Sequence, residues 1–211
     1  MKRPRLLLLL LALLAIIAVA ALAWIRLAPK KVKAIPSSPD ARATQIIHDL
    51  NLKPLPKESG YLGIIGVSAQ TLTDHGHPLA DQSQNYYMLT RDKPINYLHW
   101  LASDDTHILI EGGPVDYFIF HPDGRVEQQT LGLDFAHGQR PVVAVPGNCW
   151  KALRLRDGAA YALMANALSP EWTPDRVKIG AGPDFVRRYA GKAPWATPDT
   201  LRAFIGPNWK P

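Results

Sequence analysis

The stretch His99-Trp-Leu-Ala-Ser-Asp-Asp105 is followed, after six further residues, by Gly112-Gly-Pro114. A second block of the same kind, Val145-Pro-Gly-Asn-Cys-Trp-Lys151, comes after Leu131-Gly-Leu-Asp134. Both blocks lie among short apolar runs that end in turn residues, which is typical of β-strands. Between them, His121-Pro-Asp-Gly124 predicts a hairpin turn, because proline presets φ and Gly124 can adopt a positive φ.

These apolar runs predict nine strands, after one short helix that begins at Pro39-Asp40 and carries Ile46, Ile47 and Leu50 on one face. Short strands with regular turns favour a β-sandwich or a small barrel, and propensity alone does not choose between the two. The predicted strands are 61–68, 85–90, 95–101, 107–111, 115–121, 125–131, 141–145, 150–154 and 160–168.

The spacing of the two blocks resembles the general cupin pattern. That pattern reads His-x-His, three or four residues, Glu, six residues, Gly, and later Pro-x-Gly, two residues, His. In this chain His99 occupies the first ligand position, Leu101 the second, Asp105 the third and Lys151 the last. The resemblance implies a mostly β fold, a cupin-like double-stranded β-helix (jelly-roll) barrel, and the apolar patterns add a short N-terminal helix. We expect one transmembrane helix to precede this fold, on the separate evidence of an N-terminal apolar run.

A narrower resemblance, from Asp49 to about Tyr189, is to the uncharacterised small-cupin family called cupin-5. The ordered motifs that carry it are Pro56-Lys-Glu-Ser-Gly-Tyr61, His99 with Ser103-Asp-Asp105 and Gly112-Gly-Pro114, Leu131-Gly-Leu-Asp134, Val145-Pro-Gly-Asn-Cys-Trp-Lys151, and Leu168-Ser-Pro-Glu-Trp172. The chain departs from this family where a pocket would be. Asp105 replaces Glu, Lys151 replaces Gln, and Gly63 stands where Arg is usual.

The resemblance implies a pocket at the open end of the barrel, formed by His99, Asp105 and Lys151. There we expect the Lys151 ammonium to pair with the Asp105 carboxylate, either as part of a ligand site or as an ordinary ion pair at the barrel mouth. His107, in the strand after Asp105, and Tyr61, which matches the family's opening aromatic residue, complete the candidate ligand-binding set. The alternatives are that His107 faces solvent and that Tyr61 is a core residue. Leu101 offers no ligand atom, and a lysine ammonium has no lone pair at neutral pH. We therefore expect no bound metal and no other cofactor, and the sequence assigns no catalytic residue.

The N-terminal residues predict a membrane segment. Residues 6–25 form an uninterrupted apolar run of 20 residues, which spans about 30 Å as a helix, the thickness of a bilayer core. Ala21-Leu-Ala23 resembles a signal-peptidase site, so a cleaved export signal is the alternative to an uncleaved anchor. We expect a single-pass membrane protein whose body lies on the non-cytoplasmic (periplasmic) side, although basic residues flank both ends of the run.

The positive net charge belongs to this N-terminal region. The whole chain has 24 Lys/Arg, 18 Asp/Glu and a formal charge of +6, and residues 1–33 carry seven of the basic residues and no acid. The remainder has 17 basic and 18 acidic residues, a net charge of −1. This balance excludes the basic surface that nucleic-acid binding requires. Cys149 is the single cysteine, so it forms no intramolecular disulfide, and its apolar neighbours predict a buried thiol.

We divide the chain into an anchor or signal segment at 1–33, a linker and short helix at 34–48, a barrel at 49–190, and a Pro/Trp-containing tail at 191–211. We expect this tail to be loosely packed and held by Trp195 and Trp209; the alternative is that it folds back on the barrel or contacts a partner. Three functions remain open. The barrel binds a small polar or sugar-like ligand without a metal, or acts as a metal-independent sugar isomerase or epimerase with His99 as base and Lys151 as electrostatic stabiliser, or is a structural envelope protein with a vestigial pocket. The resemblance also allows for a homodimer.

Overall fold

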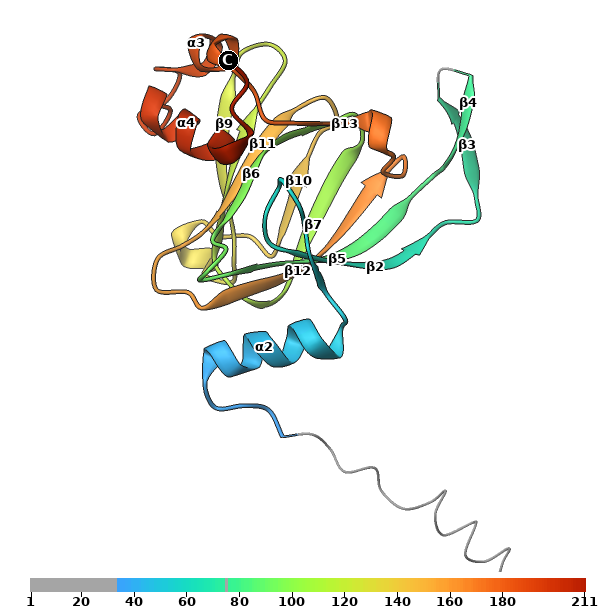
Figure 1. Ribbon diagram of the computed structural model, residues 1–211, viewed down its shortest axis with the longest axis vertical. Coiled ribbons are helices and arrows are strands. Elements are labelled where there is room, and N and C mark those ends of the chain that lie inside the picture. Colours follow the sequence, from blue (N-terminus) through green and yellow to red (C-terminus); the bar gives the residue numbers. More distant parts are fainter. Residues whose placement is uncertain (1–33, 75) are drawn as a thin grey trace, which may run out of the picture. The chain divides into compact units, whose positions relative to one another are not determined.

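The computed structural model describes residues 34–74 and 76–211, and these residues form mainly β-structure (Figure 1). The first sheet has six strands in the order β1 (Lys53–Pro54), β2 (Tyr61–Val67), β5 (Ser83–Thr90), β12 (Tyr161–Ser169), β7 (Asp104–Gly112) and β10 (Val142–Val145). The second has five strands in the order β13 (Val177–Ile179), β6 (Ile95–Leu101), β11 (Trp150–Leu155), β8 (Val115–Phe120) and β9 (Val126–Leu131). From β5 to β13 the chain passes back and forth between the two sheets, which is the predicted jelly-roll arrangement.

The inner faces of the two sheets meet in one apolar core. β5 and β12 contribute Leu89 and Met164 from the six-stranded sheet, and β8 and β11 contribute Tyr117 and Leu153 from the five-stranded sheet. Cys149 is buried in the same cluster, as predicted, and burial raises the pKa of its thiol. The core fills only part of the space between the sheets, which leaves room for a cavity.

Helices cover parts of the outer faces. Helix α2 (Pro39–Asp49) lies on the six-stranded sheet and buries Ala43 and Ile46 against residues of β5 and β12. On the five-stranded sheet, α3 (Pro183–Tyr189) and α4 (Pro198–Ile205) pack over β8. All six residues of β8 are buried, because one face points into the barrel and the other lies under these helices.

The structure confirms the nine predicted strands, with limits that differ by a few residues, and the short N-terminal helix. The turn at 121–124 joins β8 to β9, and Gly124 has the expected positive φ of 92°. The sequence analysis missed the hairpin of β3 (Thr71–Asp74) and β4 (His77–Ala80), which extends away from the barrel, and the short strands β1 and β13 (Figure 1). These elements are short and polar or rich in proline, so their apolar periodicity is weak.

The prediction of a loosely packed C-terminal tail is wrong. Leu201, Phe204 and Ile205 of α4 are buried against the five-stranded sheet, because their i, i+3, i+4 spacing gives the helix an apolar face. Trp195 packs edge-on against Phe118 with ring centroids 4.9 Å apart, whereas Trp209 is exposed. Residues after 190 therefore belong to the folded body, with one of the two tryptophans as an anchor.

The predicted membrane segment at residues 6–25 lies outside the described residues. Within the described part of the chain, none of the helices has the length and apolar character needed to cross a membrane. Residues Pro36–Pro211 form one compact unit.

Candidate functional site

A cavity of about 290 Å³ lies between the two sheets, beside the apolar core. This volume is at the small end of the range of about 300–1,000 Å³ that is usual for ligand pockets. Leu62 and Ile64 of β2, Leu101 of β6 and Trp172 contribute to an apolar wall. The polar side chains gather at one side of the cavity, and they come from both sheets.

Strand alternation and register bring the predicted polar residues together. Asp105 and His107 are two residues apart on β7, so both point into the barrel from the six-stranded sheet. His99 of β6 and Lys151 of β11 are directly opposite each other in the antiparallel register of the five-stranded sheet. The site therefore depends on the two sheets facing each other, which local sequence cannot specify.

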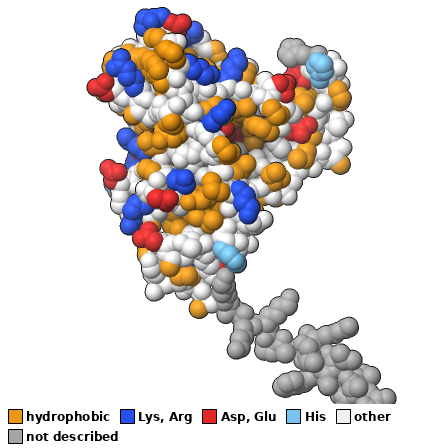
Figure 2. All heavy atoms as spheres, in the orientation of Figure 1, with side chains coloured by type: hydrophobic (Ala, Val, Ile, Leu, Met, Phe, Trp, Pro, Cys, Tyr) orange, Lys and Arg blue, Asp and Glu red, His pale blue; other side chains and the backbone are white. Residues whose placement is uncertain are grey.

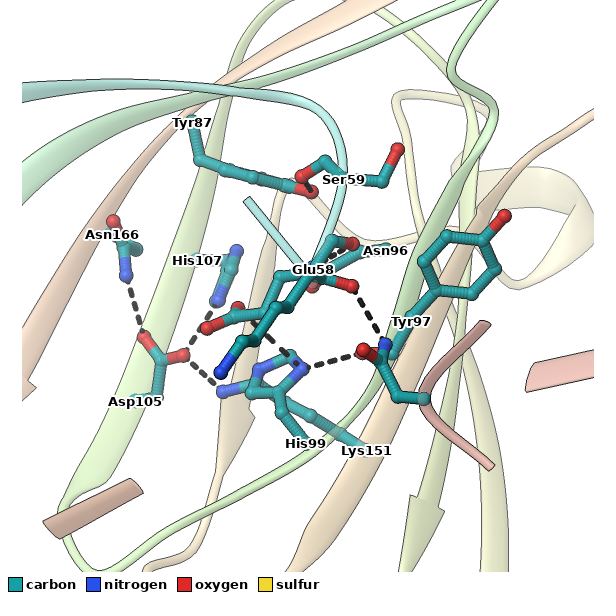
Figure 3. Close-up of polar contacts among 12 residues, drawn as sticks. Glu58, Ser59, Tyr87, Asn96, Tyr97, His99, Asp105, His107, Lys151 and Asn166 are labelled. Carbon is teal, nitrogen blue, oxygen red and sulfur yellow. Dashed lines mark hydrogen bonds and ion pairs between the residues drawn. The ribbon is translucent and has the colours of Figure 1, made fainter. Parts of the chain in front are cut away.

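Asp105 is the centre of a buried polar cluster (Figure 3). Its Oδ2 accepts a hydrogen bond from Nε2 of His107 at 2.8 Å and forms an ion pair with Nζ of Lys151. Its Oδ1 accepts a hydrogen bond from Nδ2 of Asn166 at 3.2 Å. The Asp105 and Lys151 side chains are only 3% and 2% exposed. Burial alone would raise the pKa of the Asp105 carboxyl, but His107 and Lys151 hold that pKa well below its usual range.

His99 is a neutral base at the wall of the cavity. Its Nδ1 donates a hydrogen bond to the backbone oxygen of Tyr97 at 2.9 Å, which fixes the tautomer and leaves a lone pair on Nε2. Burial lowers the pKa of His99 below its ordinary value, although the nearby Glu58 carboxylate, with Oε2 at 3.7 Å from Nδ1, opposes the shift. A neutral imidazole with a free lone pair can accept a hydrogen bond or a proton.

The structure places the predicted Asp105–Lys151 pair and His99 at one site, and it brings His107 to the same cavity. Lys151 lies behind Asp105 and is not one of the residues that line the cavity. The structure therefore contradicts the expectation that Lys151 points into the cavity. Its side chain instead neutralises the buried Asp105 carboxylate.

The prediction that Tyr61 lines the pocket is also wrong. Leu62 and Ile64 of β2 face the cavity, so the alternation of the strand turns Tyr61 and Gly63 to the opposite face. There Tyr61 packs with the cluster under α2, and its ring lies 5.7 Å from Nζ of Lys93. A Cβ at Gly63 would approach a Leu52 methyl group to 2.6 Å, so Gly63 serves packing outside the cavity and not the pocket.

Several site residues were not identified from the sequence. Glu58, Tyr87, Asn96 and Asn166 all line the cavity. The sequence offered a signal for one of these four residues: Glu58 belongs to the Pro56–Tyr61 block that carried the family resemblance. The other three lie on strands that were correctly predicted, but no spacing rule shows which of their faces meets the pocket.

The residues at this site do not suit the metal that many cupin folds hold. Leu101 lines the cavity with a side chain that has no donor atom, and Lys151 forms an ion pair with the carboxylate at the third ligand position. Within residues 34–74 and 76–211, no three His, Cys, Asp or Glu side chains are grouped so that they could hold a metal ion. We therefore derive no chemistry through a metal at this site.

The fold and the cavity agree with the comparisons to known proteins. Residues 44–179 match the family model described as "Cupin superfamily (DUF985)", and the chain belongs to this family. An uncharacterized protein of Saccharomyces cerevisiae is 37% identical over 67 residues, which span 32% of this chain and only 33% of the relative.

Two solved structures have the same fold. A hypothetical protein from Leishmania major superposes with a TM-score of 0.60 at 25% identity, over 65% of this chain and 86% of that one. A protein from Shewanella oneidensis superposes with a TM-score of 0.62 at 21% identity, over 80% of this chain and 98% of that one. The likeness to these two structures establishes the fold alone.

Proposed function

We propose that the protein is a metal-free cupin that binds a small organic ligand in the cavity between its sheets. The observation that carries this proposal is the pairing of an apolar wall with a preorganised polar side. Asp105, His107 and Asn166 hold one another through hydrogen bonds of 2.8 and 3.2 Å, and the Lys151 ion pair balances the charge of Asp105. A few fixed polar groups in an apolar cavity are typical of small-molecule sites.

The cavity limits the size and character of the ligand. A volume of about 290 Å³ corresponds to about ten water molecules in the liquid, at about 30 Å³ each. The wall formed by Leu62, Ile64 and Leu101 favours a ligand with an apolar or C–H-rich side, and sugar rings have such a side. The polar end of the ligand would face Glu58 and His99.

Two neighbouring residues of β2 provide a matched test. Ile64 is 77% exposed and lines the cavity, whereas the adjacent Ile65 is 45% exposed and does not. We expect ligand-observed NMR with a set of sugars, amines and acids to detect binding to the wild type. Ile64→Trp should weaken binding about tenfold or more, because the indole fills the cavity, whereas Ile65→Trp should leave it unchanged. Absence of binding by every compound, or equal binding by both variants, would reject the proposal.

A specific pair of residues also favours the second candidate, a metal-independent isomerase or epimerase. His99 is neutral with a free Nε2, and Tyr87 lines the same cavity with a hydroxyl whose pKa is raised well above its ordinary value by burial. A neutral base can remove a proton from a substrate carbon, and the Tyr87 phenol could return one if it released its hydrogen bond to the Ser59 carbonyl. The test is deuterium incorporation from D₂O next to the carbonyl of bound keto sugars. The exchange should disappear in His99→Gln while binding persists.

We propose that residues 1–33 attach this body to a membrane and that the body lies on the non-cytoplasmic side. The uninterrupted apolar run at 6–25 and its basic flanks support this proposal. The full-length protein should stay with membranes during carbonate extraction. A mature N-terminus at Trp24 would instead identify a cleaved signal, and a C-terminal reporter that is active only in the cytoplasm would contradict the orientation.

A further inference from the structure

The two carboxylates at the cavity differ in how they are compensated. Asp105 has Lys151 as its counter-ion and accepts hydrogen bonds from His107 and Asn166. Glu58 has no Lys or Arg partner among the described residues. Its side chain is only 15% exposed, and the nearest basic atom is Nδ1 of His99 at 3.7 Å. That nitrogen already donates its hydrogen to the Tyr97 carbonyl, so the Glu58 carboxylate lacks a partner.

The chain holds Glu58 in this position through its backbone. The Glu58 carbonyl accepts hydrogen bonds from the Tyr97 backbone N–H at 2.7 Å and from Nδ2 of Asn96 at 3.1 Å. The residues on either side, Lys57 and Ser59, both have positive φ angles, of 64° and 73°. Residues other than glycine adopt such angles infrequently, so the contacts of the loop determine its shape and fix the Glu58 side chain at the cavity (Figure 3).

The other polar groups at the cavity offer few donors to a ligand. Nε2 of His99 carries a lone pair and has no hydrogen-bond partner in the part of the chain that the structure describes. The Tyr87 hydroxyl donates to the Ser59 carbonyl at 2.9 Å, and the Asn96 amide donates to Glu58. Elsewhere on the cavity wall, Asn85 and Ser83 have both donor and acceptor groups and favour neither kind of ligand, and Trp172 contributes an indole N–H donor. Without the imidazoles, the formal charges of Glu58, Asp105 and Lys151 add up to −1.

We infer that the ligand of this cavity is a small organic cation with N–H donors, an amidinium or alkylammonium group on an apolar body. This inference rests on the proposed binding function and adds the class of ligand. A positive N–H group would provide the counter-ion that Glu58 lacks and a donor for His99, while the apolar body would contact Leu62 and Leu101. A carboxylate of the same shape would instead face the Glu58 carboxylate and the lone pair of His99 without compensation.

Three isosteric probes separate charge and hydrogen bonding from shape. Benzamidine is a cation with N–H donors, benzamide is neutral, and benzoate is an anion, and all three have the same apolar ring. Titration calorimetry or ligand-observed NMR on the full-length protein should show benzamidine binding about tenfold more tightly than benzamide, because a hydrogen bond between two charged groups is stronger than one with a neutral donor. Benzoate should bind most weakly.

Glu58→Gln provides the decisive variant, because it removes the charge and keeps the shape and the backbone contacts of Glu58. It should reduce the affinity for benzamidine about tenfold and leave that for benzamide nearly unchanged. Asp157→Asn, which removes an exposed carboxylate in the turn after β11, should change neither. If benzoate or benzamide binds more tightly than benzamidine, the inference is overturned while the proposed function stands. Absence of binding by all three also overturns the inference, and the wider fragment screen then decides the proposed function separately.

Discussion

The buried Asp105–Lys151 ion pair offers the sharpest test of the site. Both side chains are nearly inaccessible to water, with exposed fractions of 3% and 2%, so removing one charge leaves the other in the protein interior. Such a loss typically costs about 3–5 kcal/mol of the free energy of unfolding. The prediction concerns Asp105→Asn, Lys151→Met and the double variant, measured together as one thermodynamic cycle.

The contacts of the two residues predict unequal effects. Asp105→Asn leaves the Lys151 ammonium without its carboxylate, so this variant should lose about 5 kcal/mol of the free energy of unfolding. Lys151→Met leaves the Asp105 carboxylate with its hydrogen bonds from His107 and Asn166. This variant should therefore lose only about 3 kcal/mol of the free energy of unfolding. The double variant removes both charges and should be no less stable than Asp105→Asn alone. The coupling energy should therefore be at least about 3 kcal/mol.

Urea denaturation of the full-length protein, followed by tryptophan fluorescence and circular dichroism, gives these free energies. The matched control is the exposed pair of Arg91 and Asp40, whose atoms lie 3.3 Å apart while both side chains are 62% exposed. Arg91→Met and Asp40→Asn should couple by only about 0–1 kcal/mol. A coupling below about 1.5 kcal/mol between Asp105 and Lys151 would refute the desolvated pair and the polar side of the cavity that depends on it.

Four further predictions follow from the same structure. Because the pKa of folded Asp105 lies below its unfolded value near 3.9, its contribution to stability is present above about pH 5 and is lost as the pH falls below about 4, so Asp105→Asn should flatten the acid limb of a stability–pH profile. Phe204→Ala should cost about 3–5 kcal/mol, whereas Trp209→Ala should cost less than about 1 kcal/mol, and equal effects in thermal unfolding would contradict the packing of α4. Elemental analysis of the untagged, dialysed protein should find well under one equivalent of zinc, iron, manganese or nickel, and a stoichiometric metal would overturn the argument from Leu101 and Lys151. The body, with its net charge of −1, should give no gel shift with nucleic acid at physiological salt, and tight binding that weakens steeply with salt would disprove this expectation.

Much of the fold follows from local patterns along the chain. The alternating or continuous apolar runs located nine strands, and the His121–Gly124 sequence located one hairpin turn. These features depend on side-chain periodicity and turn chemistry within a few residues, which sequence records directly. The choice of a jelly-roll barrel came from the ordered motifs and their family resemblance, because propensity does not distinguish a sandwich from a barrel.

The two wrong predictions about the pocket, for Tyr61 and Lys151, have a common cause: the sequence does not show which way a strand's side chains point. Tyr61 was placed in the pocket because it matches a family position, but the next residue, Leu62, is the one that points inward. Lys151 was placed correctly beside Asp105, yet its ammonium ends behind the carboxylate and not at the cavity. Neighbouring side chains in a strand point to opposite faces of the sheet, and a sequence motif does not specify which of them faces the pocket.

The sequence by itself determined the residue types that chemistry here would require: an acid at Asp105, a base at His99, and a lysine where a metal ligand would otherwise stand. It also determined the strands that carry them, since alternation and turn residues are local. Only the tertiary structure decided which groups meet. Asp105 and Lys151 lie on opposite sheets, and Glu58 reaches the cavity from a loop that Tyr97 and Asn96 hold in place. Contacts of this kind depend on the packing of segments far apart in the chain, so the uncompensated carboxylate that suggests a cationic ligand appears only once the two sheets are closed around it.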